Sequence, residues 1–92
     1  MSYEVRFDEG AVRDLRRVGN AEARRITARL GWLAEHIDET SSEMLAGAFH
    51  GLLKLRIGDY RVAYTVDRPA NVIRVHMVGH RREIYDIDPD QP

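Results

Sequence analysis

The basic residues of this 92-residue chain are concentrated between residues 51 and 82, which hold seven Lys or Arg and only two Asp or Glu, although the whole chain has a formal charge of −1. The side chains of chemical interest in and just beyond this stretch are Lys54, Arg56, Arg61, Arg74, His76, His80, Arg81, Arg82 and Tyr85. Cationic groups bind phosphates, and an aromatic ring stacks on an unpaired base, so this combination suits single-stranded RNA. We therefore expect an RNA-binding surface here.

The same residues restrict how RNA would be cut. Cleavage without a metal needs a group that takes the 2′-hydroxyl proton, a group that stabilises the charge on the phosphate and a group that protonates the departing 5′-oxygen. Arginine suits the second task, because it stays protonated in proteins. Lys54 is the candidate for the first task, since the neighbouring Arg56 and Arg61 disfavour its charged form.

Nothing in the sequence indicates a cofactor or a metal. The chain has no cysteine, and it has neither a P-loop nor a dinucleotide-binding glycine pattern. His76 and His80 are four residues apart, but we expect them on a strand and a following turn, with no carboxylate to complete a set of ligands. We expect no metal and no cofactor.

Alternation of side chains predicts that the basic residues lie on one face of an antiparallel sheet. Gly58-Asp59 suits a two-residue type II′ hairpin turn, which pairs residues 53–57 with residues 60–64. A second loop, at residues 68–71, gives the pairs Val66 with Ile73, Tyr64 with Val75, Val62 with Met77 and Ala63 with His76. Because side chains alternate along a strand, one exposed face should collect Lys54, Arg56, Arg61, Arg74 and His76.

The charge on this face is unfavourable for a purely structural surface. Arg56 is expected directly opposite Arg61, and no acidic residue is expected on the face. Like charges in such positions destabilise a sheet by roughly 0.2–1 kcal/mol, and a bound polyanion would relieve the repulsion. The alternative is an ordinary solvated face of a half-buried sheet.

Before the sheet, the sequence predicts a strand and two helices. Strict alternation predicts a strand over residues 3–7. Asp8 is then positioned to cap a helix that runs to about residue 18, and Asn20 to cap a second helix over residues 21–38. The second helix has a continuous apolar stripe made of Ala23, Ile26, Leu30, Leu33 and Ile37. Trp32 lies outside this stripe, either at the edge of the core or on a partner surface.

These elements form one α+β domain over residues 1–92, in which an N-terminal strand, a helical hairpin and a three-stranded antiparallel meander complete a twisted antiparallel sheet. We expect a connector at residues 39–50 and a flexible acidic tail at residues 86–92. No stretch approaches the ~18 apolar residues of a membrane span, and the N-terminus lacks the apolar segment of a signal peptide. A cytoplasmic protein without a membrane partner is expected.

Two motifs, supported by Leu45-Ala46-Gly47 upstream, resemble a known family. They are residues 53–64, LKLRIGDYRVAY, and residues 78–85, VGHRREIY. In combination they resemble the RelE/ParE superfamily of toxin–antitoxin toxins, specifically its RelE branch. The resemblance implies a β-α-α-β-β-β fold and a metal-independent endoribonuclease that enters the ribosomal A site, cuts mRNA and inhibits translation. It also implies a cognate RelB-like antitoxin that silences the toxin, and operator DNA as a partner of the toxin–antitoxin complex.

The resemblance assigns catalytic roles to four residues. Lys54 matches a lysine that acts at the scissile phosphate, in proton transfer or charge stabilisation, and Arg61 matches the arginine that holds this phosphate. Arg81 matches a basic residue implicated in protonating the leaving group, and Tyr85 matches the aromatic residue that stacks on the mRNA nucleotide. Leu52 departs from the pattern, because some members carry a lysine there.

Alternatives stay open for the acid and for the whole function. His80 or His76 is chemically an easier general acid than Arg81, since histidine changes its charge near neutral pH, and His80 is the alternative acid. The residues expected to contact RNA are Arg56, Arg74, His76, His80 and Arg82. The alternative functions are a ParE-like toxin that inhibits DNA gyrase through protein contacts, and a degenerate member that binds an antitoxin without nuclease activity.

Overall fold

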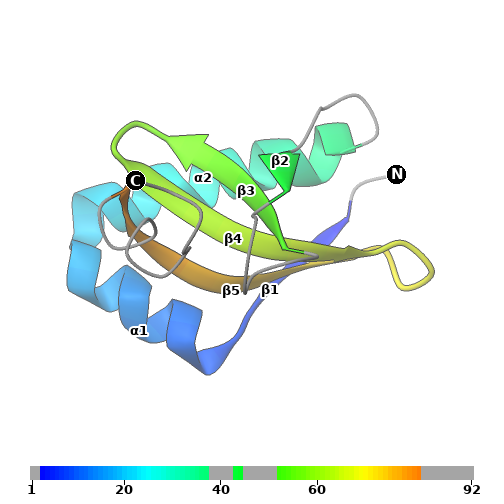
Figure 1. The fold of residues 1–92 in the computed structure, drawn as a ribbon, viewed down its shortest axis with the longest axis horizontal. Helices are drawn as coiled ribbons and strands as arrows, with labels where there is room; N and C mark the ends of the chain where they lie inside the picture. Colours follow the sequence, from blue (N-terminus) through cyan, green and yellow to red (C-terminus); the bar gives the residue numbers. More distant parts are fainter. Residues whose placement is uncertain (1–2, 38–42, 45–51, 82–92) are drawn as a thin grey trace.

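The chain folds as a strand, two helices and four further strands in a computed structural model that describes residues 3–37, 43–44 and 52–81 (Figure 1). The elements are β1 (Glu4–Phe7), α1 (Glu9–Val18), α2 (Asn20–His36), β2 (Glu43–Met44), β3 (Leu53–Ile57), β4 (Tyr60–Asp67) and β5 (Val72–His80). The α+β class and the predicted order of elements are confirmed, and β2 is an addition within the predicted connector. Arg82, Tyr85 and the expected tail at residues 86–92 lie outside the described residues.

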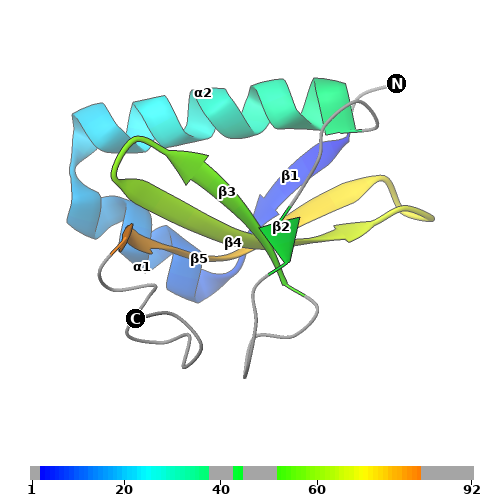
Figure 2. The same ribbon diagram turned by 45° about the horizontal axis from the view of Figure 1, so that its top comes forward.

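The strands form one mixed sheet in the order β1-β5-β4-β3-β2. β1 runs parallel to β5, with Phe7 opposite Val75, while all other neighbours are antiparallel. The prediction of a wholly antiparallel sheet is therefore wrong at β1. The helical hairpin is the reason: it returns the chain to the start of β1, where the amide of Tyr3 donates to the carbonyl of Ala34 at 2.9 Å. β3 and β5 consequently run in the same direction as β1 (Figure 2).

The hairpin of β3 and β4 has the predicted register. Its five pairs are Leu53 with Tyr64, Lys54 with Ala63, Leu55 with Val62, Arg56 with Arg61 and Ile57 with Tyr60. Gly58 has a φ of 59° and Asp59 does not have a positive φ, as expected for a type II′ turn. A residue with a side chain would be strained at the position of Gly58.

A β-bulge changes the register between β4 and β5. The pairs nearest the connecting loop are as predicted, and they end with Tyr64 opposite Val75. Past the bulge, Ala63 lies opposite Met77 rather than His76, which makes His76 the extra residue of β5. The predicted partners of residues 62 and 63 are therefore wrong. From Met77 onward, each side chain of β5 faces the side of the sheet opposite to the predicted one.

α1 begins where predicted, α2 begins one residue earlier than predicted, and neither helix has the predicted side-chain cap. α1 follows Asp8, whose carboxylate makes no capping hydrogen bond. Gly19, rather than Asn20, occupies the cap position of α2, with a φ of 96° that favours glycine. The carbonyl of Gly19 accepts a hydrogen bond from the amide of Ala23 at 2.9 Å. Asn20 is thus the first residue of α2 instead of its cap.

Both helices cover the same face of the sheet and form the main core with it (Figures 1 and 2). The fully buried large side chains are Tyr64, Ile26, Leu30, Leu33, Ile73, Val62, Val75 and Val78. On the second face, Ala63 is buried beneath the partly buried Leu52 and Met77. Within the described ranges, neither helix combines the length and the apolar composition needed to cross a membrane.

Candidate functional site

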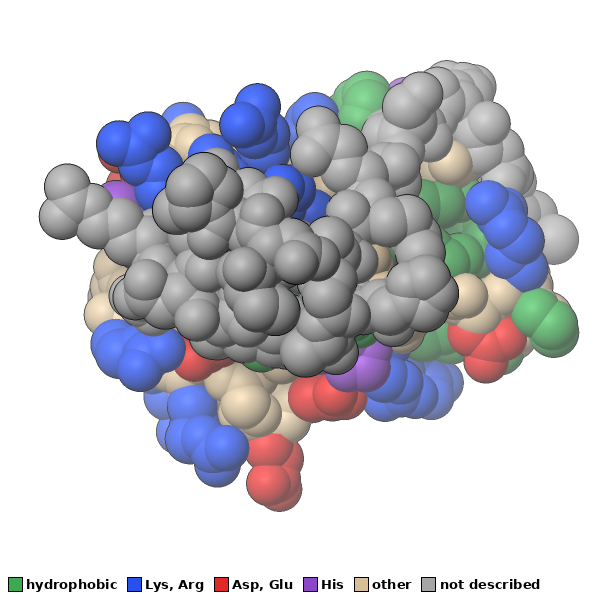
Figure 3. All heavy atoms as spheres, viewed as in Figure 1, with side chains coloured by type: hydrophobic (Ala, Val, Ile, Leu, Met, Phe, Trp, Pro, Cys, Tyr) green, Lys and Arg blue, Asp and Glu red, His purple; other side chains and the backbone are tan. Residues whose placement is uncertain are grey.

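The second face of the sheet carries Lys54 and Arg56 on β3, as predicted. Lys54 is half-buried and lies between Ala63 of β4 and Glu43 of β2. Arg56 is exposed and lies opposite Arg61. In Figure 3, basic side chains are distributed around the periphery of the molecule, with several along its upper edge. Lys54 and Arg56, two of the predicted cations, occupy alternate positions on one face of β3.

Arg61 is only 5% exposed, so the prediction that it is exposed is wrong. Its Nη1 donates to the carbonyl oxygens of Gly58 and Tyr60, both at 2.9 Å. The guanidinium therefore fastens the β3–β4 turn. Its Nε is buried and has no hydrogen-bond partner among the residues that the structure describes. Arg61 thus stabilises the turn through Nη1, while its buried Nε has no hydrogen-bond partner among the described residues.

Arg81 brings another cation to the end of the sheet that contains this turn. It follows β5 directly, and its amide donates to the carbonyl oxygen of Asp59 at 2.7 Å. The residue is exposed. We call Lys54, Arg56, Arg61 and Arg81 the turn-end cluster. Tyr85 and Arg82, which were predicted to contribute to the same site, fall outside the part of the chain that is described.

His80 lies in β5 rather than in a turn, and it faces the helices. It is directly opposite Tyr60, and such partners project from the same face of a sheet. Tyr60 packs against the main core, and the two rings meet edge-on with their centroids 5.7 Å apart. His80 is therefore on the other face from Lys54 and Arg56. This position does not favour His80 as the acid for a phosphate bound by the turn-end cluster.

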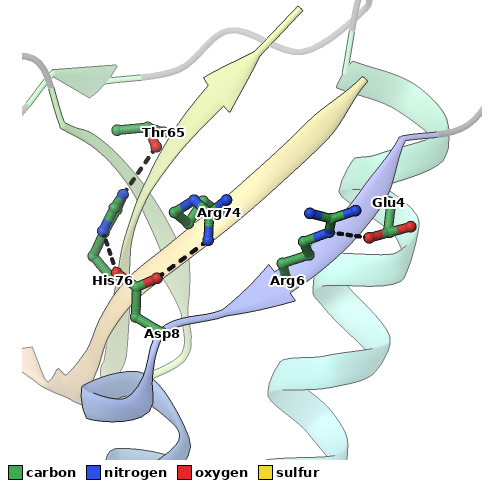
Figure 4. Close-up of polar contacts among 6 residues, drawn as sticks. All are labelled: Glu4, Arg6, Asp8, Thr65, Arg74 and His76. Carbon is green, nitrogen blue, oxygen red and sulfur yellow. Dashed lines mark hydrogen bonds and ion pairs between the residues drawn. The ribbon is translucent and has the colours of Figure 1, made fainter. Parts of the chain in front are cut away.

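A second polar cluster lies where β1, β4 and β5 meet (Figure 4). Nδ1 of His76 is 2.7 Å from Oδ2 of Asp8, and Nε2 of His76 is 2.9 Å from Oγ1 of Thr65. Nη1 of Arg74 is 3.5 Å from the other carboxylate oxygen of Asp8. We call these four residues the Asp8–His76 cluster. Arg74 and His76 are therefore paired with an acid, whereas the prediction gave this face none.

The sequence did not predict this cluster because it depends on the parallel pairing of β1 with β5. Asp8 and His76 are 68 positions apart, and Asp8 directly follows the strand that lies beside β5. Asp8 was interpreted as a helix cap, but its side chain turns to β5 instead. The only sequence signals for the Asp8–His76 cluster were a histidine in a predicted strand, His76, and an acidic residue before a predicted helix, Asp8.

A groove with a volume of about 470 Å³ lies between α2 and the β3–β4 turn. It is lined by Arg25, Ala28, Arg29, Trp32, Arg56, Ile57 and Gly58. Trp32 is 41% exposed, which favours the surface position over the core edge. The guanidinium of Arg29 lies 4.3 Å from the centroid of the Trp32 indole ring. The ring of His36 stacks on the same indole ring, with the two ring centroids 4.4 Å apart.

Comparison with known proteins relates these features to a family. Residues 5–85 match the sequence profile of the family described as the ParE toxin of type II toxin–antitoxin system, parDE. Among proteins of curated function, none matches this chain at a significant level.

Solved toxin structures have the same fold. The toxin–antitoxin complex RelBE2 from Mycobacterium tuberculosis contains a chain with 26% identity and a TM-score of 0.77, covering 88% of this chain and 100% of that chain. The archaeal RelE-RelB complex from Pyrococcus horikoshii OT3 gives 28% identity and a TM-score of 0.69, covering 88% and 97%. The isolated E. coli RelE toxin, with 23% identity and a TM-score of 0.71, covers 94% of each chain and is alike in fold. Because the profile extends over residues 5–85, this chain belongs to the ParE toxin family of type II toxin–antitoxin systems, within the RelE/ParE superfamily.

Proposed function

We propose that this toxin is a ribosome-dependent endoribonuclease, which cleaves mRNA in the ribosomal A site without a metal and so inhibits translation. The proposed catalytic residues are Lys54, Arg61, Arg81 and Tyr85. Membership of the toxin family and the likeness to RelE structures at 26% and 28% identity support this proposal. The proposed location is the cytoplasm, where ribosomes and mRNA are found.

The turn-end cluster is the observation that carries the proposal. Arg56 lies opposite Arg61, Lys54 lies two positions away on the same face, and the backbone of Arg81 is bonded to the adjoining turn. The buried Nε of Arg61 lacks a partner among the described residues, and an unsatisfied buried donor costs about 1–3 kcal/mol. A phosphate oxygen that displaced the groups covering this guanidinium would satisfy the donor, and its charge would strengthen the bond.

The chemistry follows from these side chains. Arg61 would stabilise the charge that develops on the phosphate, since a fixed guanidinium needs no reorganisation during the reaction. Lys54 would act beside it, in proton transfer or in charge stabilisation, and Arg81 would lie near the leaving oxygen. The half-buried position of Lys54 and the exposure of Arg81 support this division.

A RelB-like antitoxin is the proposed partner that silences the toxin. One of the similar structures is described as the toxin–antitoxin complex RelBE2, and another as a RelE-RelB complex. We further propose that the resulting complex binds operator DNA, as the family resemblance implies. The antitoxin would prevent access of mRNA to the turn-end cluster.

Primer extension on cellular mRNA after induction of the toxin tests this function. We expect growth arrest, and cuts that lie within translated codons. Co-expression of the neighbouring antitoxin gene should remove both effects. The variant Lys54→Ala should abolish most of the cutting, because it removes a cation from the scissile phosphate. Intact mRNA in arrested cells would contradict the nuclease proposal.

A ParE-like toxin that inhibits DNA gyrase is the second candidate. The description of the matched family names ParE. In addition, Nη1 of Arg61 binds the backbone of its own turn, at Gly58 and Tyr60. If this candidate is right, mRNA stays intact, the purified toxin inhibits supercoiling by gyrase, and Lys54→Ala remains toxic. A degenerate member would bind the antitoxin but show neither activity.

A further inference from the structure

We propose that His76, oriented by Asp8, is the base that takes the 2′-hydroxyl proton in RNA cleavage, an inference that rests on the proposed nuclease function. His76 is not among the four catalytic residues proposed above. The Asp8–His76 cluster contains a proton acceptor, a carboxylate that orients it and a cation beside them. Asp8 would be a positioning residue, because it acts only through His76.

The hydrogen bonds determine which nitrogen of the neutral His76 ring accepts a proton. The carboxylate of Asp8 only accepts, so Nδ1 of His76 carries a proton and donates it across 2.7 Å. Nε2 then has the free electron pair, and the hydroxyl of Thr65 donates to it at 2.9 Å. The ring therefore already holds its accepting nitrogen against an alcohol, as a base for a ribose hydroxyl must.

The cluster is open to a substrate. The exposed fractions of the side chains are 29% for His76, 37% for Asp8 and 46% for Arg74. In the proposed complex, a ribose hydroxyl replaces the hydroxyl of Thr65 at Nε2. Figure 4 shows Asp8 between His76 and Arg74, so a guanidinium lies close to the base. A guanidinium in this position suits the phosphate that adjoins the attacked ribose.

The proposed reaction is an attack by the 2′-hydroxyl on the adjoining phosphate. The 2′-oxygen attacks phosphorus, the O2′–P bond forms, and the 2′-proton passes to Nε2 of His76. The P–O5′ bond breaks, and the departing 5′-oxygen takes a proton from the ammonium group of Lys54, which acts as the acid in place of Arg81. The products are a 2′,3′-cyclic phosphate and a 5′-hydroxyl. Solvent then removes the proton from His76 and returns one to Lys54, and no oxidant, reductant or metal takes part.

The register of the sheet places Lys54 and His76 within reach of one phosphate. Lys54 lies opposite Ala63, which lies opposite Met77, the neighbour of His76. Adjacent strands are about 4.8 Å apart, so the backbones of the two residues are separated by roughly 10 Å across the sheet. Two side chains that converge from this separation can contact opposite sides of a phosphodiester.

A purely structural role is the main alternative. The amide of Asp8 also donates to the carbonyl of Val75 at 2.9 Å, so the cluster also helps to join β1, α1 and β5. A metal site is a weaker alternative, since the described ranges contain no group of three His, Asp or Glu side chains that could hold an ion. The structural role and the catalytic role differ in their dependence on pH and on the tautomer of His76.

Single-turnover cleavage on programmed ribosomes tests the proposal. His76→Gln keeps a polar side chain but cannot take the proton, so we expect a loss of roughly 100-fold in cleavage rate, the scale of general base catalysis, with unchanged ribosome binding. Asp8→Asn should reduce the rate at least ~10-fold, because an amide favours the wrong tautomer, and Asp8→Glu should restore part of it. His36→Gln on α2 is the matched control, with unchanged rate.

The pH dependence gives a readout that a structural role would not affect. Among the described residues, the charged groups that face His76 are Asp8, from the β1–α1 junction, and Arg74, from β5 itself; Thr65 of β4 is neutral. A base acts only when it is unprotonated, so wild-type cleavage should become faster as pH rises. The rate of a folded His76→Gln variant should not show this increase.

The outcomes separate the inference from the proposed function. A wild-type toxin that leaves mRNA intact would overturn both the proposed nuclease function and the role of His76. A wild type that cleaves, alongside a folded His76→Gln variant that cleaves equally fast, overturns the role of His76 alone. If His76→Gln does not fold, the wild-type pH profile decides, because a cleavage rate that does not change with pH excludes His76 as the base.

Discussion

The side chain of Arg61 stabilises the β3–β4 turn by hydrogen bonds. Its Nη1 bonds to two carbonyl oxygens, at Gly58 and Tyr60, and the side chain is buried. Arg56, directly opposite, is exposed. The two arginines therefore differ in what they contribute to folding, although alternation along the strands places them on the same face.

Replacement of Arg61 should separate these contributions. Arg61→Ala should lower the free energy of unfolding by about 1–3 kcal/mol, because a buried side chain and its two hydrogen bonds to the turn are lost. Arg56→Ala should change it by less than about 0.5 kcal/mol, as exposed substitutions usually do. Denaturant unfolding of both variants measures the difference. Equal stability of the two variants would show that the contacts of Arg61 with the turn contribute little.

The candidate residues could be found from the sequence, but their environments could not. Lys54, Arg56 and Arg81 are accessible basic residues in the predicted region. The burial of Arg61 depends on tertiary contacts that alternation along a strand does not report. Asp8 was missed because a cap position explained it locally, while its carboxylate bonds to His76 across the fold.

Among the elements, α1 compensates for the short length of β1. β1 pairs with β5 only as far as Val75, so the outer edge of β5 beyond it needs another cover. Oδ2 of Asp14, on α1, accepts a hydrogen bond from the amide of Val78 at 3.0 Å. A side chain of the helix thus satisfies a strand edge that would otherwise be open to another strand.

The register of the β3–β4 hairpin was predictable because a two-residue turn fixes it. The bulge at His76 was not, since one extra residue leaves no signal in an alternating sequence. Its consequences are large for the site: His80 moves to the helix side with Tyr60, and Met77 moves to the second face with Ala63. The direction of β1 was missed for a related reason, because sequence patterns do not show how a helical hairpin returns the chain.

Gly58→Ala tests the turn that carries the turn-end cluster. Gly58 has a φ of 59°, and a Cβ added there would lie 2.9 Å from a guanidinium nitrogen of Arg25. The substitution should lower the free energy of unfolding by about 1–2 kcal/mol, mainly through backbone strain. Adding Arg25→Ala should relieve the contact but not the strain, so most of the loss should persist in thermal or denaturant melts.

Gly31→Ala is the matched control for this substitution. Gly31 lies within α2, and a Cβ added there would meet nothing within 4 Å. Alanine should therefore stabilise the protein by up to about 1 kcal/mol, as expected for a glycine in a helix interior. If Gly58→Ala were as stable as Gly31→Ala, the turn would tolerate a side chain and its proposed strain would be absent.

At the scale of the whole molecule, the net charge is small, but the basic residues are concentrated in one segment of the chain. The formal charge is −1, yet residues 51–82 carry seven basic residues against two acidic ones. The mixed sheet places part of this basic segment beside the N-terminal elements, where Arg74 and His76 bond to Asp8. Arg56, Arg61 and Arg81 of the turn-end cluster lie by the β3–β4 turn, whereas Lys54 lies further along β3, opposite Ala63 and two strands from His76.

This concentration of basic residues predicts how binding should respond to salt. Each phosphate contact contributes about −0.7 to the slope of log affinity for single-stranded RNA against log salt. Contacts by Lys54, Arg56, Arg61, Arg74 and Arg81 would therefore give a slope of about −3.5, measured by titration of the antitoxin-free toxin. Arg56→Gln should reduce the magnitude by about 0.7, because it removes one contact. Arg17→Gln should leave the slope unchanged, since Arg17 is on α1 and pairs with Asp14. An affinity that does not vary with salt would exclude the basic residues of the sheet as the RNA-binding surface, and would leave protein contacts as the basis of toxicity.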